Sequence, residues 1–260
     1  MKVSNREKLY NQLSFLYDKL YSYKDYNTEA RFIKQIVRKN IGLNNSNSIF
    51  HLDLACGTGR HITALNHLGG FKSIGIDINR GILSIAKENN PNSIFRLGDL
   101  SSFQSNKRYT LITCLFSSIQ YVLNESTLLK TFKNVHSQLK SGGLFIFDLG
   151  YCKERWKENH TVLSTYKDNE YEIILMAQSR SARNISTWNP VIFYKRNHKL
   201  DMIIDEHKIR IYSVKYVVRQ LEKTGFEVSV FSDFTNKLYS QKQNSVPVIV
   251  ARKIKFKDDE

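Results

Sequence analysis

Apolar runs and amphipathic segments alternate along the first 150 residues. Short apolar runs rich in β-branched and aromatic residues predict buried strands over residues 49–55, 72–77, 93–97, 109–115 and 143–148. Apolar residues at helical spacing predict helices between most of these strands, over residues 59–68, 79–89 and 124–139. This alternation predicts a parallel sheet that is covered by helices on both faces.

The pattern changes after residue 150. Residues 160–212 lack a helical period, and polar turns help to separate predicted strands over residues 162–166, 171–177, 187–194 and 200–211. A helix over 213–224 and strands over 226–231 and 246–254 then return to the first pattern. The sequence therefore predicts an α/β fold: a Rossmann-like, mostly parallel seven-stranded sheet with an antiparallel β insertion after the fifth strand. Two further helices are predicted over residues 6–22 and 27–39, and a polar loop over residues 44–48.

The most informative stretch is residues 51–61, where a buried strand ends in a Gly-x-Gly turn that opens a helix. A phosphate loop would need a lysine after Gly59, and a dinucleotide motif would need a glycine where Ile62 stands. The remaining pattern, Asp53-x-x-x-Gly57-x-Gly59, carries an acid that would repel a pyrophosphate. That acid suits the ammonium and the sulfonium of S-adenosylmethionine (SAM). The predicted cofactor turn is Ala55-Cys56-Gly57-Thr58-Gly59.

Two more acids stand at predicted strand ends, where a nucleoside needs hydrogen-bond acceptors. Asp77 lies 24 residues after Asp53, close to the spacing of a ribose-binding acid, and a carboxylate accepts both ribose hydroxyls. Asp99 is placed to accept the adenine amino group. The residues that follow the two acids, Ile78 and Leu100, complete the predicted cofactor contacts. A lone aspartate of this kind is more often a helix cap or a turn residue, but three in this order favour a cofactor site.

Three further motifs lie outside the cofactor strands: Tyr17-Asp18-Lys19-Leu20-Tyr21 with Lys24-Asp25-Tyr26, then Leu115–Tyr121, and Glu206-His207-x-x-Arg210-x-Tyr212. With the cofactor motifs, they resemble the class I SAM-dependent methyltransferases. The resemblance is strongest to a small-molecule subgroup that includes N,N-dimethyltransferases of nucleotide-linked amino sugars. It implies a helical lid over residues 1–40 and a SAM-binding domain over residues 41–150 and 213–260. Residues 151–212 are then the β insertion over the acceptor site.

Ligands bind at the carboxyl ends of the strands in such sheets, which places the acceptor site. Leu115 and Phe116 are predicted to contact the cofactor. His207 is the best candidate for steering or removing the proton of an amine, and Tyr21 is the second catalytic candidate. A packed structural histidine and a core tyrosine explain these two residues about as well. The predicted substrate-binding residues are Tyr17, Tyr26, Ser117, Ser118, Tyr121, Asp148 and Arg210.

The acceptor can be narrowed from the same residues. No Asn/Asp-Pro-Pro-Tyr follows the fourth strand and Cys114 lies inside it, so methylation of base amines or of cytosine C5 is not expected. A nucleotide-linked amino sugar is predicted first, with an amino acid or another metabolite as the alternative. The net charge of +15 keeps a nucleic-acid-binding protein or RNA methyltransferase open, although the charge is spread along the chain. A SAM-binding module without catalysis is the third interpretation.

Three cysteines without a Cys-x-x-Cys pair predict thiols in a reducing compartment, and the charged first residues predict no signal peptide. We therefore expect a cytoplasmic enzyme. No metal is expected, because no His/Cys/Asp cluster has metal-ligand spacing. No membrane partner is expected, because no apolar run approaches about 18 residues. The expected partner is a small-molecule acceptor, and a homodimer is left open.

Overall fold

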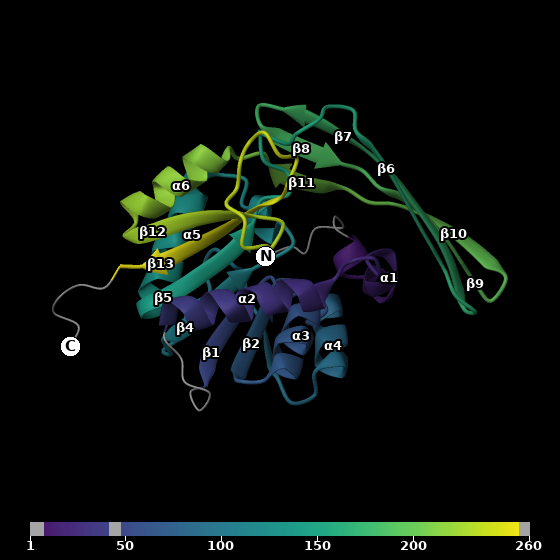
Figure 1. Cartoon of the computed structure of the whole chain (residues 1–260). Coiled ribbons are helices and arrows are strands. Elements are labelled where there is room, and N and C mark those ends of the chain that lie inside the picture. Colours follow the sequence, from purple (N-terminus) through teal and green to yellow (C-terminus); the bar gives the residue numbers. More distant parts are fainter. Residues whose placement is uncertain (1–7, 42–47, 255–260) are drawn as a thin grey trace.

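A seven-stranded sheet forms the centre of the protein (Figure 1). The structure, a computed structural model, describes residues 8–41 and 48–254. The strand order is β12-β13-β5-β4-β1-β2-β3, in which β1 to β5 are parallel to one another, β13 is antiparallel to β5, and β12 is antiparallel to β13. This confirms the predicted mostly parallel sheet. The strands are β1 Ile49–Leu54, β2 Phe71–Asp77, β3 Ile94–Leu97, β4 Tyr109–Cys114, β5 Leu139–Asp148, β12 Phe226–Ser232 and β13 Pro247–Lys253.

Helices cover both faces of this sheet, as predicted. One buried cluster holds apolar side chains of α2 and α3, and another, on the opposite face, holds those of α5 and α6. The glycine turn after β1 packs with α4 in a smaller cluster. The helices are α1 Ser14–Leu20, α2 Tyr26–Ile41, α3 Arg60–Leu68, α4 Arg80–Asn89, α5 Glu125–Gln138 and α6 Val214–Lys223, with 3-10 turns at Lys8–Tyr10 and Ser118–Tyr121.

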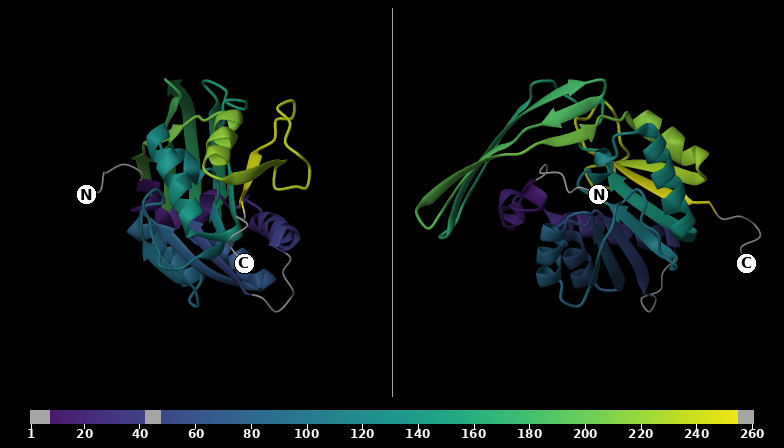
Figure 2. Two further views of the ribbon diagram at one scale, coloured as in Figure 1. Left: turned by 90° about the vertical axis from the view of Figure 1, so that its left-hand side faces the viewer. Right: turned by 180° about the vertical axis from the view of Figure 1, so that it is seen from behind.

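The predicted insertion is a six-stranded antiparallel sheet in the order β10-β9-β7-β8-β11, with β6 on the other side of β7. Figures 1 and 2 show that β6, β7, β9 and β10 project as a long arm beyond the central sheet. One face of the arm packs on α1 and the residues before it, where Leu13 and Leu16 meet Ile173 and Leu175. The strands are β6 Thr161–Lys167, β7 Tyr171–Ala182, β8 Ile185–Trp188, β9 Val191–Arg196, β10 Lys199–Ile204 and β11 His207–Arg210.

Two strands of the insertion were predicted wrongly, because each of them is divided into two strands in the structure. The strand expected over 187–194 ends at Trp188 and restarts at Val191, because Pro190 has no N–H to donate to a sheet partner. The strand expected over 200–211 breaks at Asp205, whose N–H donates to the carbonyl of Pro190 at 3.0 Å. At the first break the chain passes from β8, which pairs with β11, into β9 of the arm. At the second break it leaves the arm from β10 and enters β11.

The N-terminal helix predicted over residues 6–22 is also divided. Within the described residues, a 3-10 turn ends at Tyr10 and α1 begins only at Ser14. The turn between them passes close to α4, where a Cβ added to Gly81 would lie 2.5 Å from the carbonyl oxygen of Asn11. β5 starts at Leu139 rather than at residue 143, with a register shift against β4. The first residues of the predicted helix and residues 44–47 of the predicted loop lie outside the described residues.

Candidate functional site

A hollow lies where β1 and β4 end, beneath the N-terminal segment. The backbone that forms it is unusual, because Ala55, Phe116 and Ser117 have φ angles of 55°, 57° and 61°. Left-handed backbone at residues other than glycine is strained and concentrates at functional sites. The lining residues are Tyr17, Tyr26, Asp53, Ala55, Cys56, Gly57, Thr58, Arg60, His61, Leu115, Phe116 and Ser118.

Asp53 presents an unpaired carboxylate oxygen at this hollow. Its Oδ1 accepts a hydrogen bond from Thr113 Oγ1 at 2.6 Å, whereas its Oδ2 is buried without a partner. Burial raises the pKa of Asp53 from 3.8 to about 6. A buried acceptor without a donor is costly, so the site is built for a donor or a cation that the protein does not itself supply.

A hydrogen-bonded chain behind Asp53 fixes its orientation. His51 Nε2 lies 2.7 Å from Thr113 Oγ1, and His51 Nδ1 lies 3.0 Å from Ser73 Oγ. Because the single hydrogen of the Thr113 hydroxyl goes to Asp53, His51 Nε2 must donate to Thr113 and Nδ1 must accept from Ser73. Burial lowers the pKa of His51 to about 3, so the imidazole is neutral at physiological pH. The sequence alone did not reveal this series of hydrogen bonds, since His51 and Thr113 look like ordinary strand residues.

The two glycines of the turn serve different purposes. Gly57 has φ +55°, and a Cβ added there would meet one apolar side chain only, at an ordinary 3.8 Å. At Gly59, in contrast, a Cβ would lie 2.7 Å from the side chain of Asn90, so this glycine admits the close packing of α4. Asp77 supports the turn: its Oδ2 accepts from Gly57 N at 3.1 Å and its Oδ1 from Asn79 N at 2.9 Å. A carboxylate has about four lone-pair positions, which leaves Asp77 able to accept further bonds.

The third strand-end acid lies farther along the same sheet edge. Asp99 Oδ1 accepts from both the N–H and the hydroxyl of Ser101 at 2.7 Å, which makes it a turn cap in this structure. Leu100 is half-buried and Ile78 is exposed by 43%. None of these residues lines the hollow at the end of β1.

The N-terminal segment is tied to the glycine turn by Asp18. Its carboxylate accepts from Thr58 Oγ1 at 2.6 Å and from Arg60 Nε at 2.8 Å. These two bonds join α1 to the residues on either side of Gly59. Neither Asp18 nor Arg60 was assigned a site role from the sequence, although Asp18 stands inside the Tyr17–Tyr21 motif.

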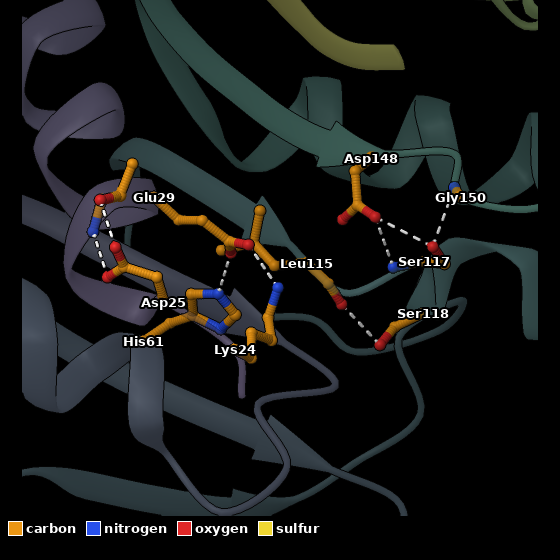
Figure 3. A network of polar contacts seen from close by, with 10 residues as sticks. Lys24, Asp25, Glu29, His61, Leu115, Ser117, Ser118, Asp148 and Gly150 are labelled. Atoms are coloured by element: carbon orange, nitrogen blue, oxygen red, sulfur yellow. Dashed lines mark hydrogen bonds and ion pairs between the residues drawn. The ribbon is translucent and has the colours of Figure 1, made fainter. Parts of the chain in front are cut away.

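A second link runs from the start of α2 to α3 (Figure 3). Glu29 accepts from His61 Nε2 at 2.7 Å and from the Lys24 ammonium, which lies 4.4 Å from the ring centre of Phe116. Burial opposes the ionisation of Glu29, but the hydrogen bonds from His61 and Lys24 outweigh it and lower its pKa. Asp25 begins the helix by accepting from Thr28 N at 2.9 Å. The segment therefore closes one side of the hollow with charged and aromatic groups.

The loop after β4 is held by a second buried carboxylate (Figure 3). Asp148 Oδ2 accepts from the N–H and the hydroxyl of Ser117, each at 2.9 Å, and Ser117 Oγ accepts from Gly150 N at 2.9 Å. Ser118 Oγ donates to the Leu115 carbonyl at 2.8 Å. Asp148 Oδ1 has no partner, and burial raises its pKa. Ser117 and Asp148 thus hold the strained backbone of the loop.

His207 lies in a separate buried network. Its Nδ1 lies 3.0 Å from the Tyr121 hydroxyl, which lies 2.8 Å from the Tyr10 hydroxyl, and its Nε2 lies 3.1 Å from Asp205 Oδ2. Burial would raise the pKa of Asp205, but bonds from His207 and the N–H of Leu9 outweigh it and lower the pKa to about 2. His207 is fully buried and does not line the hollow. Asp205 Oδ2 accepts from His207 Nε2–H, and the other ring nitrogen, Nδ1, faces the Tyr121 hydroxyl.

The other predicted acceptor residues divide in the same way. Tyr21 is half-buried, with ring centres of Tyr17 at 4.8 Å and Phe116 at 5.1 Å, and burial raises its pKa well above 10. Arg210 pairs with Glu125 at 2.9 Å and does not line the hollow. The structure therefore gathers most of the predicted cofactor turn with Tyr17, Tyr26 and Ser118, and sets His207, Tyr121 and Arg210 apart from it.

Comparison with known proteins agrees with this geometry. Residues 52–143 match the family model of the methyltransferase domain. A solved SAM-dependent methyltransferase from Clostridium acetobutylicum shares the fold, with a TM-score of 0.80 and 24% identity over 94% of this chain and 98% of that one. These findings agree with the predicted class: residues 52–143 match a methyltransferase domain, the chain shares the fold of a solved SAM-dependent methyltransferase, and SAM is the cofactor of that class. The unpaired Asp53 oxygen and the open space at Gly57 fit its cationic end.

Two relatives in sequence are informative. A dTDP-3-amino-3,6-dideoxy-α-D-glucopyranose N,N-dimethyltransferase from Streptomyces fradiae is 27% identical over 158 residues, which are 59% of this chain and 59% of that enzyme. An uncharacterised protein from Methanocaldococcus jannaschii is 29% identical over 89% of this chain and 82% of its own length.

In the described part of the chain, no group of three or more His, Cys, Asp or Glu residues could hold a metal ion. No helix in this part is long and apolar enough to span a bilayer.

Proposed function

We propose that this protein transfers methyl groups from SAM to the amine of a small polar acceptor, with a nucleotide-linked amino sugar as the first candidate. The observation that carries the proposal is the unpaired Asp53 Oδ2, buried at the end of β1 beside the Gly57 turn. The identity of the acceptor is supported by the likeness to the Streptomyces fradiae amino-sugar dimethyltransferase and by the Tyr17–Tyr21 and Leu115–Tyr121 motifs.

The cofactor residues follow from their places at the strand ends. When bound, SAM supplies a methyl group that is already activated on a sulfonium. Asp53 holds the cationic end of the ligand, and Asp77 binds the ribose hydroxyls while it supports the turn at Gly57. Asp99 and Leu100 bind the adenine. Ala55, Cys56, Gly59, Ile78, Leu115 and Phe116 complete the proposed walls.

His207 acts on the acceptor through Tyr121 in this proposal. It is fully buried, so it reaches the acceptor only through the Tyr121 hydroxyl, which lies 3.0 Å from its Nδ1 and which it holds in place. A hydroxyl held in this way can accept a hydrogen bond from an amine. Tyr21 stays protonated at neutral pH, because its pKa is raised, and acts as an aromatic wall rather than as a base. Ser117, Ser118, Tyr26 and Asp148 shape the same side of the site.

The domain division gives each part a task. Residues 1–40 act as a lid that Asp18 fastens to the glycine turn, and residues 151–212 place His207 and Arg210 on the acceptor side. Residues 41–150 and 213–260 supply the cofactor site. The three cysteines are free and buried, which supports work in a reducing compartment such as the cytoplasm.

The proposal is tested by a screen of acceptors with the purified protein and SAM, which follows S-adenosylhomocysteine release. The acceptors are dTDP-linked 3-amino and 4-amino sugars, free amino acids and a structured RNA. We expect turnover with an amino sugar, and fragment masses of the product should place the added methyl groups on nitrogen. Turnover with RNA only, or tight SAM binding without turnover on any acceptor, would contradict the proposal.

A further inference from the structure

Two exposed tyrosines lie together beside the proposed site. The chain has fourteen tyrosines, all in its described part, and only Tyr23 and Tyr151 are exposed, by 72% and 47%. Tyr23 follows α1, and Tyr151 follows β5. Burial raises the pKa of Tyr151 first, and the neighbouring Tyr23 and Asp148 raise it further. The two exposed rings are therefore neighbours in space, although they are far apart in the sequence.

A row of aromatic rings joins these two tyrosines to the hollow. Tyr17 and Phe116 line the hollow, and their ring centres lie 4.8 Å and 5.1 Å from the ring centre of Tyr21. The ring centre of Tyr23 lies 6.2 Å from that of Tyr21. Burial is the largest cause that raises the pKa of Tyr21, and the nearby Tyr151 and Tyr23 are the next causes. The row therefore runs from the hollow to the surface and ends in the two exposed rings.

The backbone around Tyr151 is firmly held. Its N–H donates to Oε1 of Gln120 at 3.0 Å, and its carbonyl accepts from Nε2 of Gln120 at 3.0 Å. The residue before it, Gly150, lies against Ser117 (Figure 3), where its N–H donates to Ser117 Oγ at 2.9 Å. A Cβ added to Gly150 would lie 2.5 Å from the same oxygen. An exposed ring on a backbone that is held in this way is preorganised for a ligand.

Gln120 connects three segments of the fold. The second hydrogen of its amide donates to the carbonyl of Arg210 at 2.9 Å, so one side chain joins the loop after β4, the loop after β5 and β11. Gln120 is fully buried, and both hydrogens and the oxygen of its amide have partners. It does not line the hollow. Its influence on a ligand therefore passes through the residues that it holds.

We propose that Tyr151 binds the methyl acceptor and that Gln120 is the positioning residue that fixes Tyr151 for this contact. The inference rests on the proposed function and adds two residues to its acceptor side. Tyr151 takes a flat ring face of the acceptor, either the base or the sugar ring, because exposed aromatic side chains stack on such faces. Tyr23 supplies a second ring beside it. The hydroxyl of Tyr151 keeps its proton at neutral pH, because its pKa is raised, and donates a hydrogen bond to the same ligand.

Calorimetry on the full chain loaded with S-adenosylhomocysteine tests the contact without turnover. The probes are dTDP and the methyl glycoside of a 3-amino sugar, which separate the base from the sugar ring. Tyr151→Ala should weaken the binding of at least one probe by about 10-fold or more, the scale of one lost stacking contact. Tyr151→Phe should lose much less affinity, because it keeps the ring. Phe50→Ala is the matched control, since it removes a 37% exposed aromatic ring near the start of β1, away from the hollow.

Variants of Gln120 test the positioning role. Gln120→Leu keeps the approximate size of the side chain and removes all three bonds, so the same probe should bind about 10-fold more weakly while SAM affinity stays unchanged. Combined with Tyr151→Ala, it should cause no further loss, because both changes remove one contact. A merely structural role would lower the melting temperature and leave the probe affinity of the folded fraction intact. If Gln120→Leu unfolds, Gln120→Glu replaces it, because its side chain still accepts from the N–H of Tyr151.

The outcomes separate this inference from the proposed function. Weaker binding of dTDP assigns the stacked ring to the base, and weaker binding of the glycoside alone assigns it to the sugar. A wild type that binds neither probe overturns the contact, and so does a Tyr151→Ala variant that binds both probes as tightly as the wild type. Additive losses in the double variant overturn the role of Gln120. Probe binding that depends on Tyr151, without methylation of any amino sugar, overturns the proposed function and leaves the ring contact standing.

Discussion

Replacing Asp53 by asparagine should make the ligand-free protein more stable at neutral pH while weakening SAM binding. Burial raises the pKa of Asp53 from 3.8 to about 6, so the folded protein holds this proton to a higher pH than the unfolded chain does. The free energy of unfolding is therefore highest below about pH 4, where Asp53 is neutral. It falls as the pH rises through about 6, because the folded protein must then hold a buried, ionised carboxylate. A difference of about two pKa units corresponds to about 3 kcal/mol of unfolding free energy.

The Asp53→Asn variant does not ionise, so it does not lose unfolding free energy in this pH range. Its buried amide, however, needs hydrogen-bond partners. Thr113 can still donate to the amide oxygen, whereas the NH₂ group replaces the unpaired Oδ2. An unsatisfied buried donor costs about 1–3 kcal/mol, so the net gain at pH 7.5 should be about 0–2 kcal/mol. SAM affinity should fall by about 1.5–3 kcal/mol, which is about 10- to 150-fold, because a charge-assisted contact is lost.

Urea unfolding between pH 4.5 and 8 measures the first effect, and calorimetry with SAM measures the second. The difference in unfolding free energy between Asp53→Asn and the wild type should rise in favour of the variant up to about pH 6 and then level off. Glu222→Gln, at an exposed position on α6, is the control and should show no such trend. A difference that does not change with pH would refute the raised pKa of Asp53. Unchanged SAM affinity would refute its contact with the ligand.

Three further substitutions probe the rest of the site. Asp77→Ala should weaken SAM binding by about 1.5–3 kcal/mol in calorimetry, and unchanged affinity would remove Asp77 from the ribose contacts. Gly57→Val should abolish SAM binding while circular dichroism still shows a folded protein, because a β-branched residue at φ +55° distorts the glycine turn that lines the hollow. His207→Asn should lower turnover by about 100-fold at unchanged SAM affinity, and Tyr121→Phe should cause the same loss with no further loss in the double variant. If His207 is only structural, the His207→Asn variant melts at a lower temperature than the wild type, and its folded fraction keeps full activity.

The central sheet was predictable because its strands are short, apolar and separated by amphipathic helices. Burial on both faces removes alternation from such strands, so β1, β4 and the second half of β5 stand out as mostly apolar, buried runs. The insertion was harder. Asn189-Pro190 and Asp205-Glu206 interrupt runs that otherwise look like single strands, and only pairing with β7 and β11 shows where each run must change partner. Tertiary pairing, rather than local pattern, decides these boundaries.

The acids that we propose for the cofactor site stand out in the sequence for a related reason. Asp53 and Asp77 are charged residues within or at the end of apolar strands. A buried acid with no basic residue beside it in the sequence indicates that a ligand supplies its partner. Their supports were not visible, because His51 reaches Asp53 only through Thr113 of a neighbouring strand. Asp18 likewise meets Thr58 across 40 positions of sequence. Motif spacing points to the residues that we propose for ligand contact and says little about the residues that orient them.

The N-terminal segment joins the cofactor turn to the arm. α1 contributes Asp18 to Thr58 and Arg60, and its neighbour Lys19 pairs with Asp168 on the arm at 2.7 Å. The same helix fills the inner face of the arm with Leu16. A displacement of the arm therefore acts on the glycine turn through one short helix of seven residues. The arm, on the proposed acceptor side, is for this reason coupled by packing to the glycine turn of the proposed cofactor site, although the two come from segments far apart in the chain.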